Sequence, residues 1–489
     1  MKYAVINFEG CGFPIAKRLI DEGQDVTVGL VENNSDILTT SELKNFEKED
    51  LLEKKQRKSL YKNIVDYIPV EKLIKKLLKV KDPQEYFVFF ESNYLFKYAD
   101  LLKDKGFHGN FPTQEDRILE MDRSSAKEFV KKYYPHLKIP IVQQFNDIEK
   151  AKEFLKTSKH VWVLKSQTDL IPTFVPSTND YNLAKEQITD MLDNSKKLYE
   201  QSGFILEKKI QNFVEITPEK LYYNGVPLAL TVLFENKFLG SGNISSQVGC
   251  AGDLAFPISM DCPINTIAFP LIVDELAKKH KGFFIWDASL LIDTDTNDVY
   301  FGEFCPNRPG YNSFFTELAQ VSSVHKFFES LVDLKNPFTL GTVGVSLTMF
   351  NMLKDPDTQE TLTGASIYYP ETIEKHVWNY NVYKKTPSDV LRTVGYDYLL
   401  SPITASGKSI EEAVVKLYSY VKKFELAEVY YRPQFDFISM DYPTSILNRL
   451  QYCLERKLFT LPFPSPFQEE SPQIHKPSQP ISLSLTDKD

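Results

Sequence analysis

Short apolar runs alternate with helical spacings of apolar residues along most of the chain, which predicts a mixed α/β (α+β) protein. Residues 3–7 form an apolar run, a glycine-containing turn follows, and apolar residues then recur with helical spacing from Ile15. A second β-rich run at 26–31 completes a βαβ unit, and the run at 87–90 adds a further buried strand. We therefore expect a doubly wound, Rossmann-like domain over residues 1–112.

Strands and helices continue to alternate in the next part of the chain. The runs at 160–165 and 204–207 predict strands that end in a lysine and in a glutamate. Two further runs, 283–292 and 299–304, flank a polar turn, which predicts an antiparallel hairpin with one acidic residue on each strand. We expect these elements to form one two-lobed domain over residues 113–335.

The C-terminal part has a different pattern. Short strands resume at 341–347 and a helix is predicted over 410–423, so we expect a small mixed α/β domain over 336–445. The last stretch becomes rich in Pro, Ser and Gln, and we expect residues 446–489 to be a largely disordered tail.

Composition and charge narrow the function classes. The 489 residues carry 57 basic and 66 acidic side chains, a net charge of −9, which argues against a protein that coats nucleic acid or an anionic membrane. No run approaches the about 18 uncharged apolar residues of a membrane span. The five cysteines are scattered without a CxxC pair, which favours reduced thiols. We expect a soluble, cytoplasmic protein, and the sequence does not indicate its oligomeric state.

Gly10 and Gly12 follow the first predicted strand and precede a helix. Such a turn can place backbone amides around a phosphate, and Glu32, twenty residues beyond Gly12, could bind a ribose. Ile15 stands where the dinucleotide motif has its third glycine. A tight turn of a βαβ unit explains the same residues, so an oxidoreductase that uses a dinucleotide is only one hypothesis.

Six charged residues, most of them at predicted strand ends, form the more informative pattern. In chain order they are Arg123, Lys165, Glu207, Glu215, Asp287 and Glu303. Cations offset the charge of phosphates, and carboxylates hold Mg²⁺, so the series suits a magnesium nucleotide. Cys305 shares a strand face with Glu303 but is a soft, poor ligand for Mg²⁺. Each residue taken alone is as well explained by a solvated surface.

Residues 235–252 follow a hairpin predicted over 221–234 and hold four glycines, Gly240, Gly242, Gly249 and Gly252. Glycines let backbone amides approach a small anionic ligand closely. A flexible surface loop is the alternative explanation.

These segments, in this order, resemble the ATP-grasp superfamily and, within it, the phosphoribosylamine–glycine ligase family of purine biosynthesis. The resemblance extends from residue 1 to about 440. The segments that carry it are MKYAVINFEGCGFPIAKRL, LEMDRSSAKEF, VWVLKS, FILEKKIQNFVEIT, FENKFLGSGNISSQVGCAG, FGEFCPNRPGYN, VGVSLTMF and RTVGYDYLLSPITASGKSIEEAVVKLYSYV.

The resemblance implies an ATP-grasp fold and ATP-driven amide formation from a small amino acid and an amine, with ATP and Mg²⁺, or Mn²⁺ as an alternative. It also implies residue roles. ATP would bind at Arg123, Lys165, Glu207, Ile210 and Glu215, the metal at Asp287 and Glu303, and the substrate at Gly240, Gly242, Asn243, Gly249 and Gly252. Arg308 would hold the transferred phosphoryl group.

The chain departs from the family at three places. The segment between Lys165 and Thr178, where the family has a glycine-rich flap, holds two prolines and no glycine. Cys305 replaces the usual asparagine ligand, and Arg308 stands one residue late, which leaves Asn307 in its register. The flap without glycine and Cys305 motivate a second hypothesis, a catalytically silent ligand-binding or scaffold protein on the same fold.

Overall fold

The computed structural model describes residues 1–38, 54–166, 173–310, 312–356, 361–395 and 398–467. The central part of the segment that replaces the flap, 167–172, lies outside this description. Among the described residues, no helix has the length and apolar character that crossing a membrane requires.

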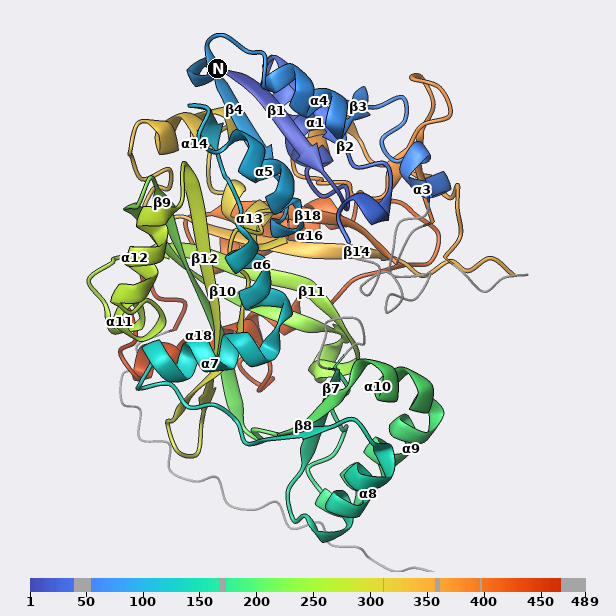
Figure 1. Cartoon of the computed structure of the whole chain (residues 1–489), viewed down its shortest axis with the longest axis vertical. Helices are drawn as coiled ribbons and strands as arrows, with labels where there is room; N and C mark the ends of the chain where they lie inside the picture. The colour runs from blue at the N-terminus through green and yellow to red at the C-terminus, as the bar shows by residue number, and fades with distance from the viewer. Residues whose placement is uncertain (39–53, 167–172, 311, 357–360, 396–397, 468–489) are drawn as a thin grey trace, which may run out of the picture.

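The N-terminal sheet has five parallel strands in the order β3-β2-β1-β4-β5, at the top of Figure 1. Its strands are β1 (Lys2–Asn7), β2 (Val26–Leu30), β3 (Tyr67–Pro69), β4 (Tyr86–Phe90) and β5 (His108–Gly109), and its helices are α1 (Phe13–Asp21), α3 (Lys54–Ser59), α4 (Val70–Leu77) and α5 (Phe96–Leu102). β1 and β4 are buried almost throughout, which explains their continuous apolar runs. The predicted βαβ opening and the strand at 87–90 are confirmed.

A small lobe is built on the antiparallel sheet β6-β8-β7 and lies apart from the rest at the lower end of Figure 1. It contains β6 (Val142–Phe145), α8 (Ile148–Thr157), β7 (Trp162–Ser166), α9 (Tyr181–Asn194), α10 (Lys196–Ser202) and β8 (Phe204–Lys208). The lobe has its own core, in which Trp162, Leu164 and Phe204 are buried. Lys165 and Glu207 lie near the ends of two paired strands, as the sequence predicts.

The central sheet is antiparallel in the order β13-β12-β9-β10-β11-β14-β18. Its strands are β9 (Phe213–Tyr223), β10 (Val226–Gly240), β11 (Ile244–Ile258), β12 (Phe283–Asp293), β13 (Val299–Phe304), β14 (Val343–Asn351) and β18 (Leu399–Gly407). Asn224 and Gly225 have φ of 48° and 78°, the geometry that a two-residue hairpin turn requires. Both predicted hairpins, β9–β10 and β12–β13, are confirmed.

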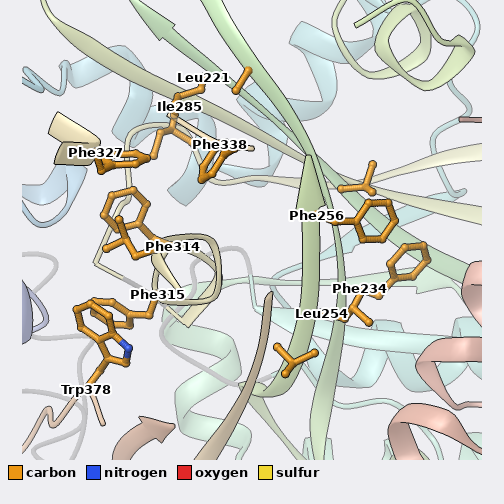
Figure 2. Close-up of a cluster of buried hydrophobic side chains, with 14 of the residues drawn as sticks. Leu221, Phe234, Leu254, Phe256, Ile285, Phe314, Phe315, Phe327, Phe338 and Trp378 are labelled. Carbon is orange, nitrogen blue, oxygen red and sulfur yellow. The ribbon is translucent and has the colours of Figure 1, made fainter. Parts of the chain in front are cut away.

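The helices around this sheet are α6 (Gln114–Met121), α7 (Arg123–Tyr133), α11 (Pro263–Ala268), α12 (Leu271–Lys279), α13 (Asn312–Leu318) and α14 (Val324–Val332). Figure 2 shows Phe314 and Phe327 of these helices near Ile285 of the sheet. Phe315 stacks on Trp378 with ring centres 4.7 Å apart. This packing fixes α13 beside the strands that carry the candidate site.

The two long strands of the C-terminal part do not form a sheet of their own, although three short strands between residues 366 and 393 do. β14 pairs with β11 and β18 pairs with β14, so residues beyond 336 continue the central sheet. The smaller elements there are β15 (Ser366–Ile367), α15 (Glu371–Glu374), β16 (Val382–Tyr383), β17 (Leu391–Thr393), α16 (Ile410–Val421), β19 (Val429–Tyr430) and α17 (Phe435–Ile438). Long-range strand pairing of this kind leaves no mark in the local pattern.

The expected tail over 446–489 is wrong in its first part. Helix α18 (Ile446–Glu455) follows Ser445, whose side chain accepts a hydrogen bond from the helix, and it contacts β9 and β10. Ile446, Leu450 and Cys453 are buried, and their helical spacing is the signal that a composition argument overlooks. Residues 468–489, where a tail is also expected, lie outside the described residues.

Candidate active site

A cavity of about 420 Å³ lies over the central sheet, on the side that carries the predicted acidic residues. Strands β9 to β13 supply most of its lining, together with the junction of α6 and α7 and with Thr173. The charged lining residues are Glu120, Arg123, Glu219, Glu235, Lys237, Asp287, Glu303 and Arg308. Of the predicted site residues, the cavity therefore brings together Arg123, Asp287, Glu303 and Arg308, with Gly249 at its edge.

Lys237 of β10 lies at the centre of the acidic lining. Its Nζ atom is 2.8 Å from Glu303 Oε1, 3.0 Å from Glu215 Oε1 and 3.4 Å from Glu235 Oε2. Lys237, followed by Arg123 and Lys165, lowers the pKa of Glu303 to about 2. The two predicted ATP-binding cations therefore act on the predicted metal ligand.

The carboxylate of Asp287 in β12 differs from that of Glu303 in its partners and in the direction of its pKa shift. The described residues give the Asp287 carboxylate no hydrogen bond and no ion pair, and burial, followed by the charge of Glu235, raises its pKa well above the usual range. Cys305 also lines the cavity, and burial raises the pKa of its thiol, so it is a neutral, soft donor.

The donor chemistry suits a hard divalent cation only in part. Asp287 and Glu303 offer carboxylate oxygens from paired strands to one cavity, where carboxylates outnumber ammonium groups. Cys305 adds no hard ligand. Among the described residues, the group of three whose ligand atoms lie within 4.8 Å of one another is instead Glu235, Cys250 and Asp253. Its Asp253 is already hydrogen-bonded by Thr316 and Ser346.

A second charged cluster joins the small lobe to α7. Glu207 Oε1 is 2.5 Å from Lys165 Nζ, and Glu207 Oε2 is 2.6 Å from Lys127 Nζ. Burial alone would raise the pKa of Glu207, but Lys165 and Lys127 outweigh it and lower the pKa to about 2. Glu207 is therefore the counter-ion of two lysines, and its carboxylate is not free for a purine base.

Helix α7 positions the cations of this region. Asp122 caps the helix by accepting hydrogen bonds from the backbone N–H groups of Ser124 and Ser125. Arg123 and Lys127 are four residues apart and lie on the same face of the helix.

The predicted hinge residue Ile210 lies elsewhere. It lines a second cavity of about 580 Å³, together with Lys208, Lys209 and Tyr300. The backbone N–H groups of Lys208 and Lys209 already donate to the carbonyls of Ile141 and Val161. The structure does not bring Ile210 into the cavity with Asp287 and Glu303. Glu215, Glu235 and Glu303 surround Lys237 and form what we call the acidic cluster. Glu215 also accepts a hydrogen bond from the Ser289 hydroxyl at 2.7 Å.

The expected glycine loop is a paired ribbon, because β10 and β11 run as 15-residue strands on both sides of η5 (Ser241–Asn243). Gly240, Gly242 and Asn243 lie at its tip, where a Cβ on Gly242 would meet the Tyr442 hydroxyl at 2.5 Å. Gly252 pairs with Leu347 of β14. Only Gly249 of the five lines the cavity, so the structure does not support the other four as substrate ligands. Here glycine permits close strand packing.

Arg308 lines the cavity, as predicted, but it has carboxylate partners of its own. It forms an ion pair with Glu120, and its Nη2 is 3.7 Å from Glu9 Oε2. Asn307 has a positive φ of 55°, is buried, and donates to Asp116 Oδ2 at 3.2 Å. The turn therefore directs residue 308, and not residue 307, toward the cavity.

An internal carboxylate occupies most of the backbone amides at the glycine turn 10–12. The buried Glu91 carboxylate accepts hydrogen bonds from the backbone N–H groups of Phe8, Glu9, Gly10 and Gly12. An internal carboxylate thus takes the place of an external anion, which contradicts the interpretation of this turn as a dinucleotide site.

Sequence reasoning missed three important residues. Lys127 is one helical turn from Arg123, and Glu235 and Lys237 stand two apart in a largely apolar strand, where such a pair shares one face. Both spacings are visible in the sequence, but the partners of these side chains are set by strand pairing over long range.

The comparisons with known proteins address the fold. No protein-family model and no curated protein matches the chain. It is similar to phosphoribosylamine–glycine ligase from Thermotoga maritima, with 15% identity, a TM-score of 0.55, and 88% of this chain and 99% of that chain covered. It is also similar to the biotin carboxylase domain of 2-oxoglutarate carboxylase from Hydrogenobacter thermophilus, with 15% identity, a TM-score of 0.52, and coverage of 94% and 96%. Biotin carboxylase from Campylobacter jejuni follows at 13% identity and a TM-score of 0.50, with coverage of 94% and 97%. The chain therefore has the ATP-grasp fold that its sequence predicts.

Proposed function

We propose that the chain is an ATP-dependent carboxylate–amine ligase, similar to phosphoribosylamine–glycine ligase but with altered substrates. The observation that carries this proposal is the placement of Lys165, Arg123 and Glu303 within electrostatic reach of one another on an ATP-grasp fold. The free cysteines are in keeping with an enzyme of the cytoplasm.

The residues have distinct roles in this proposal. Lys165 and Lys127, with Arg123, offset the charge of the triphosphate from the side of the small lobe and α7. Asp287 and Glu303 would hold Mg²⁺, which when bound neutralises phosphate oxygens. Arg308 faces the same cavity and would hold the transferred phosphoryl group once it exchanges Glu120 for phosphate.

The reaction has two steps. A substrate carboxylate oxygen attacks the γ-phosphorus, the bond from that phosphorus to the ADP oxygen breaks, and an acyl phosphate forms. An amine nitrogen then attacks the acyl carbon, phosphate leaves, and the amine gives up a proton. The chain contributes position and charge compensation, and it forms no covalent bond to the substrate.

The test is direct. We would measure binding of ATP with Mg²⁺ by calorimetry, and then release of ADP and phosphate with a panel of amino acids and amines that includes phosphoribosylamine. Lys165→Met should weaken ATP binding at least tenfold, because it removes a cation from the triphosphate site. Lys416→Met, which removes a lysine paired with Glu412 on the surface of α16, is the matched control. Absence of ATP binding in the unmodified chain would refute the proposal.

Cys305, and the ion pair of Arg308 with Glu120, favour a second candidate, a silent ATP-binding protein on the same fold. Tight ATP binding without turnover across the whole panel would favour this candidate over the ligase.

A further inference from the structure

The position of Lys237 has a consequence for metal binding, and the following inference rests on the proposed function. An ammonium group has three N–H donors, and Lys237 has three carboxylates within 3.4 Å, those of Glu303, Glu215 and Glu235. Its charge is therefore compensated by these three carboxylates, one of which, Glu303, accepts a hydrogen bond from it. A divalent cation bound to the same oxygens would lie in almost the same place.

Two cations cannot share this place without a large repulsion. Glu303 Oε1 is already 2.8 Å from the Lys237 nitrogen, whereas Mg²⁺ binds carboxylate oxygens at about 2.1 Å. A metal on Glu303 would therefore lie only a few ångströms from the ammonium, where two positive charges repel each other. The side chain of Lys237 is 19% exposed, so it has room to leave the cluster toward the cavity that it lines.

We propose that Lys237 is an internal counter-ion that occupies the metal position in the free protein and blocks the binding of metal alone. A metal that arrives with ATP brings phosphate charge, which offsets both the metal and the displaced ammonium. The chain therefore selects the metal–nucleotide complex over free metal, and Lys237 is the residue that sets this selection.

The experiment compares the affinities of the unmodified chain and its variants for free Mn²⁺ without nucleotide. The loss of the electron paramagnetic resonance signal of aqueous Mn²⁺ measures the bound fraction. The unmodified chain and Lys416→Met should bind free Mn²⁺ weakly. Lys237→Met should bind it at least tenfold more tightly, because the carboxylates then lack a counter-ion. The double variant Lys237→Met/Glu303→Gln should lose this gain. Its loss would show that the additional Mn²⁺ binds at the acidic cluster and not at acidic turns on the surface.

A variant that leaves the acidic cluster uncompensated can fail to fold. In that case Lys237→Met/Glu235→Gln, which removes one charge of each sign, takes the place of Lys237→Met, with a smaller expected gain because Glu303 and Glu215 remain. The inference is overturned if the unmodified chain binds free Mn²⁺ as tightly as the lysine variant, or if the gain persists in the double variant with Glu303→Gln.

The two proposals fail separately. If the unmodified chain binds ATP with Mg²⁺ but the lysine variant gains no affinity for free Mn²⁺, the inference on Lys237 is wrong and the ligase proposal stands. If the unmodified chain does not bind ATP with Mg²⁺, the ligase proposal is wrong, and a Mn²⁺ gain would then describe only the acidic cluster.

Discussion

Removal of the Glu207 carboxylate should loosen the contact between the small lobe and α7. The change Glu207→Gln keeps the size of the side chain but leaves Lys165 and Lys127 facing each other without a shared counter-ion. Glu207 is only 7% exposed, so water cannot replace the lost carboxylate effectively. We expect the strand β8, which carries it, to open more readily.

The magnitude follows from the pKa of Glu207, which falls from its ordinary value of 4.5 to about 2. At about 1.4 kcal/mol for each pH unit, this corresponds to about 3 kcal/mol at neutral pH. Because the pKa is depressed in the folded state, the contribution is complete above pH 4.5 and is lost as the pH falls from 4.5 toward 2. At pH 7 the whole effect should therefore be visible.

Native-state hydrogen exchange, followed by mass spectrometry on peptides that span β8, measures this local opening. Glu200→Gln is the matched control, because Glu200 pairs with Lys196 at 3.8 Å on the surface of the same lobe, where such pairs contribute less than about 1 kcal/mol. A cycle with Lys127→Met should show positive coupling to Glu207→Gln. If Glu207→Gln opens β8 no more than Glu200→Gln does, the cluster does not stabilise the lobe as argued.

Three further changes test other parts of the molecule. Cys305→Asn should tighten the binding of Mn²⁺ with ATP several-fold in calorimetry, because a hard oxygen replaces a neutral thiol; an unchanged affinity would show that residue 305 does not face the metal. Burial acts to lower the pKa of His280, but Asp116 at 3.0 Å outweighs burial and raises the pKa. The pair therefore stabilises the fold fully below the ordinary histidine pKa. This stabilisation is lost as the pH rises through the raised pKa. The difference in free energy of unfolding between the unmodified chain and His280→Gln, from urea titrations, should therefore shrink as the pH rises above the ordinary histidine pKa. Glu91→Ala leaves several buried N–H groups without an acceptor and should lower thermal stability, by about 3 kcal/mol in free energy. Added inorganic phosphate should raise the thermal stability of Glu91→Ala, because phosphate can accept from the exposed amides. It should not raise the stability of the unmodified chain.

The sequence was sufficient for features that depend on local pattern. Alternating and continuous apolar runs located β1, β4 and both hairpins, and the Asn224-Gly225 pair located a turn. The predicted hairpin also placed Asp287 and Glu303 on neighbouring strands that line one cavity. These predictions succeed because neighbours in sequence decide them.

Features that depend on register and long-range pairing were not accessible in this way. The glycines of 240–252 suggested a ligand loop, but pairing of β10 with β11 makes the segment a ribbon. Lys237 was visible as a residue of that segment, yet nothing in the local pattern shows that three carboxylates from three different strands surround it. The helix at 446–455 was missed because composition was weighed over a stretch that mixes a buried helix with a polar end.

A single feature links the Gly10–Gly12 turn, Lys237 and Arg308. Each is a site where an ATP-grasp enzyme could receive an external charge, and at each the chain supplies that charge from its own side chains. Glu91 accepts from amides of the turn, carboxylates surround Lys237, and Glu120 pairs with Arg308. A ligand at the last two must displace an internal partner, so part of its binding free energy is spent on exchange. Such exchange favours ligands that bring charges of both signs together. A metal nucleotide does this, whereas free metal or free phosphate does not. For the same reason, Lys237 and Arg308 should exchange their internal partners when ATP binds with Mg²⁺, and not with either component alone.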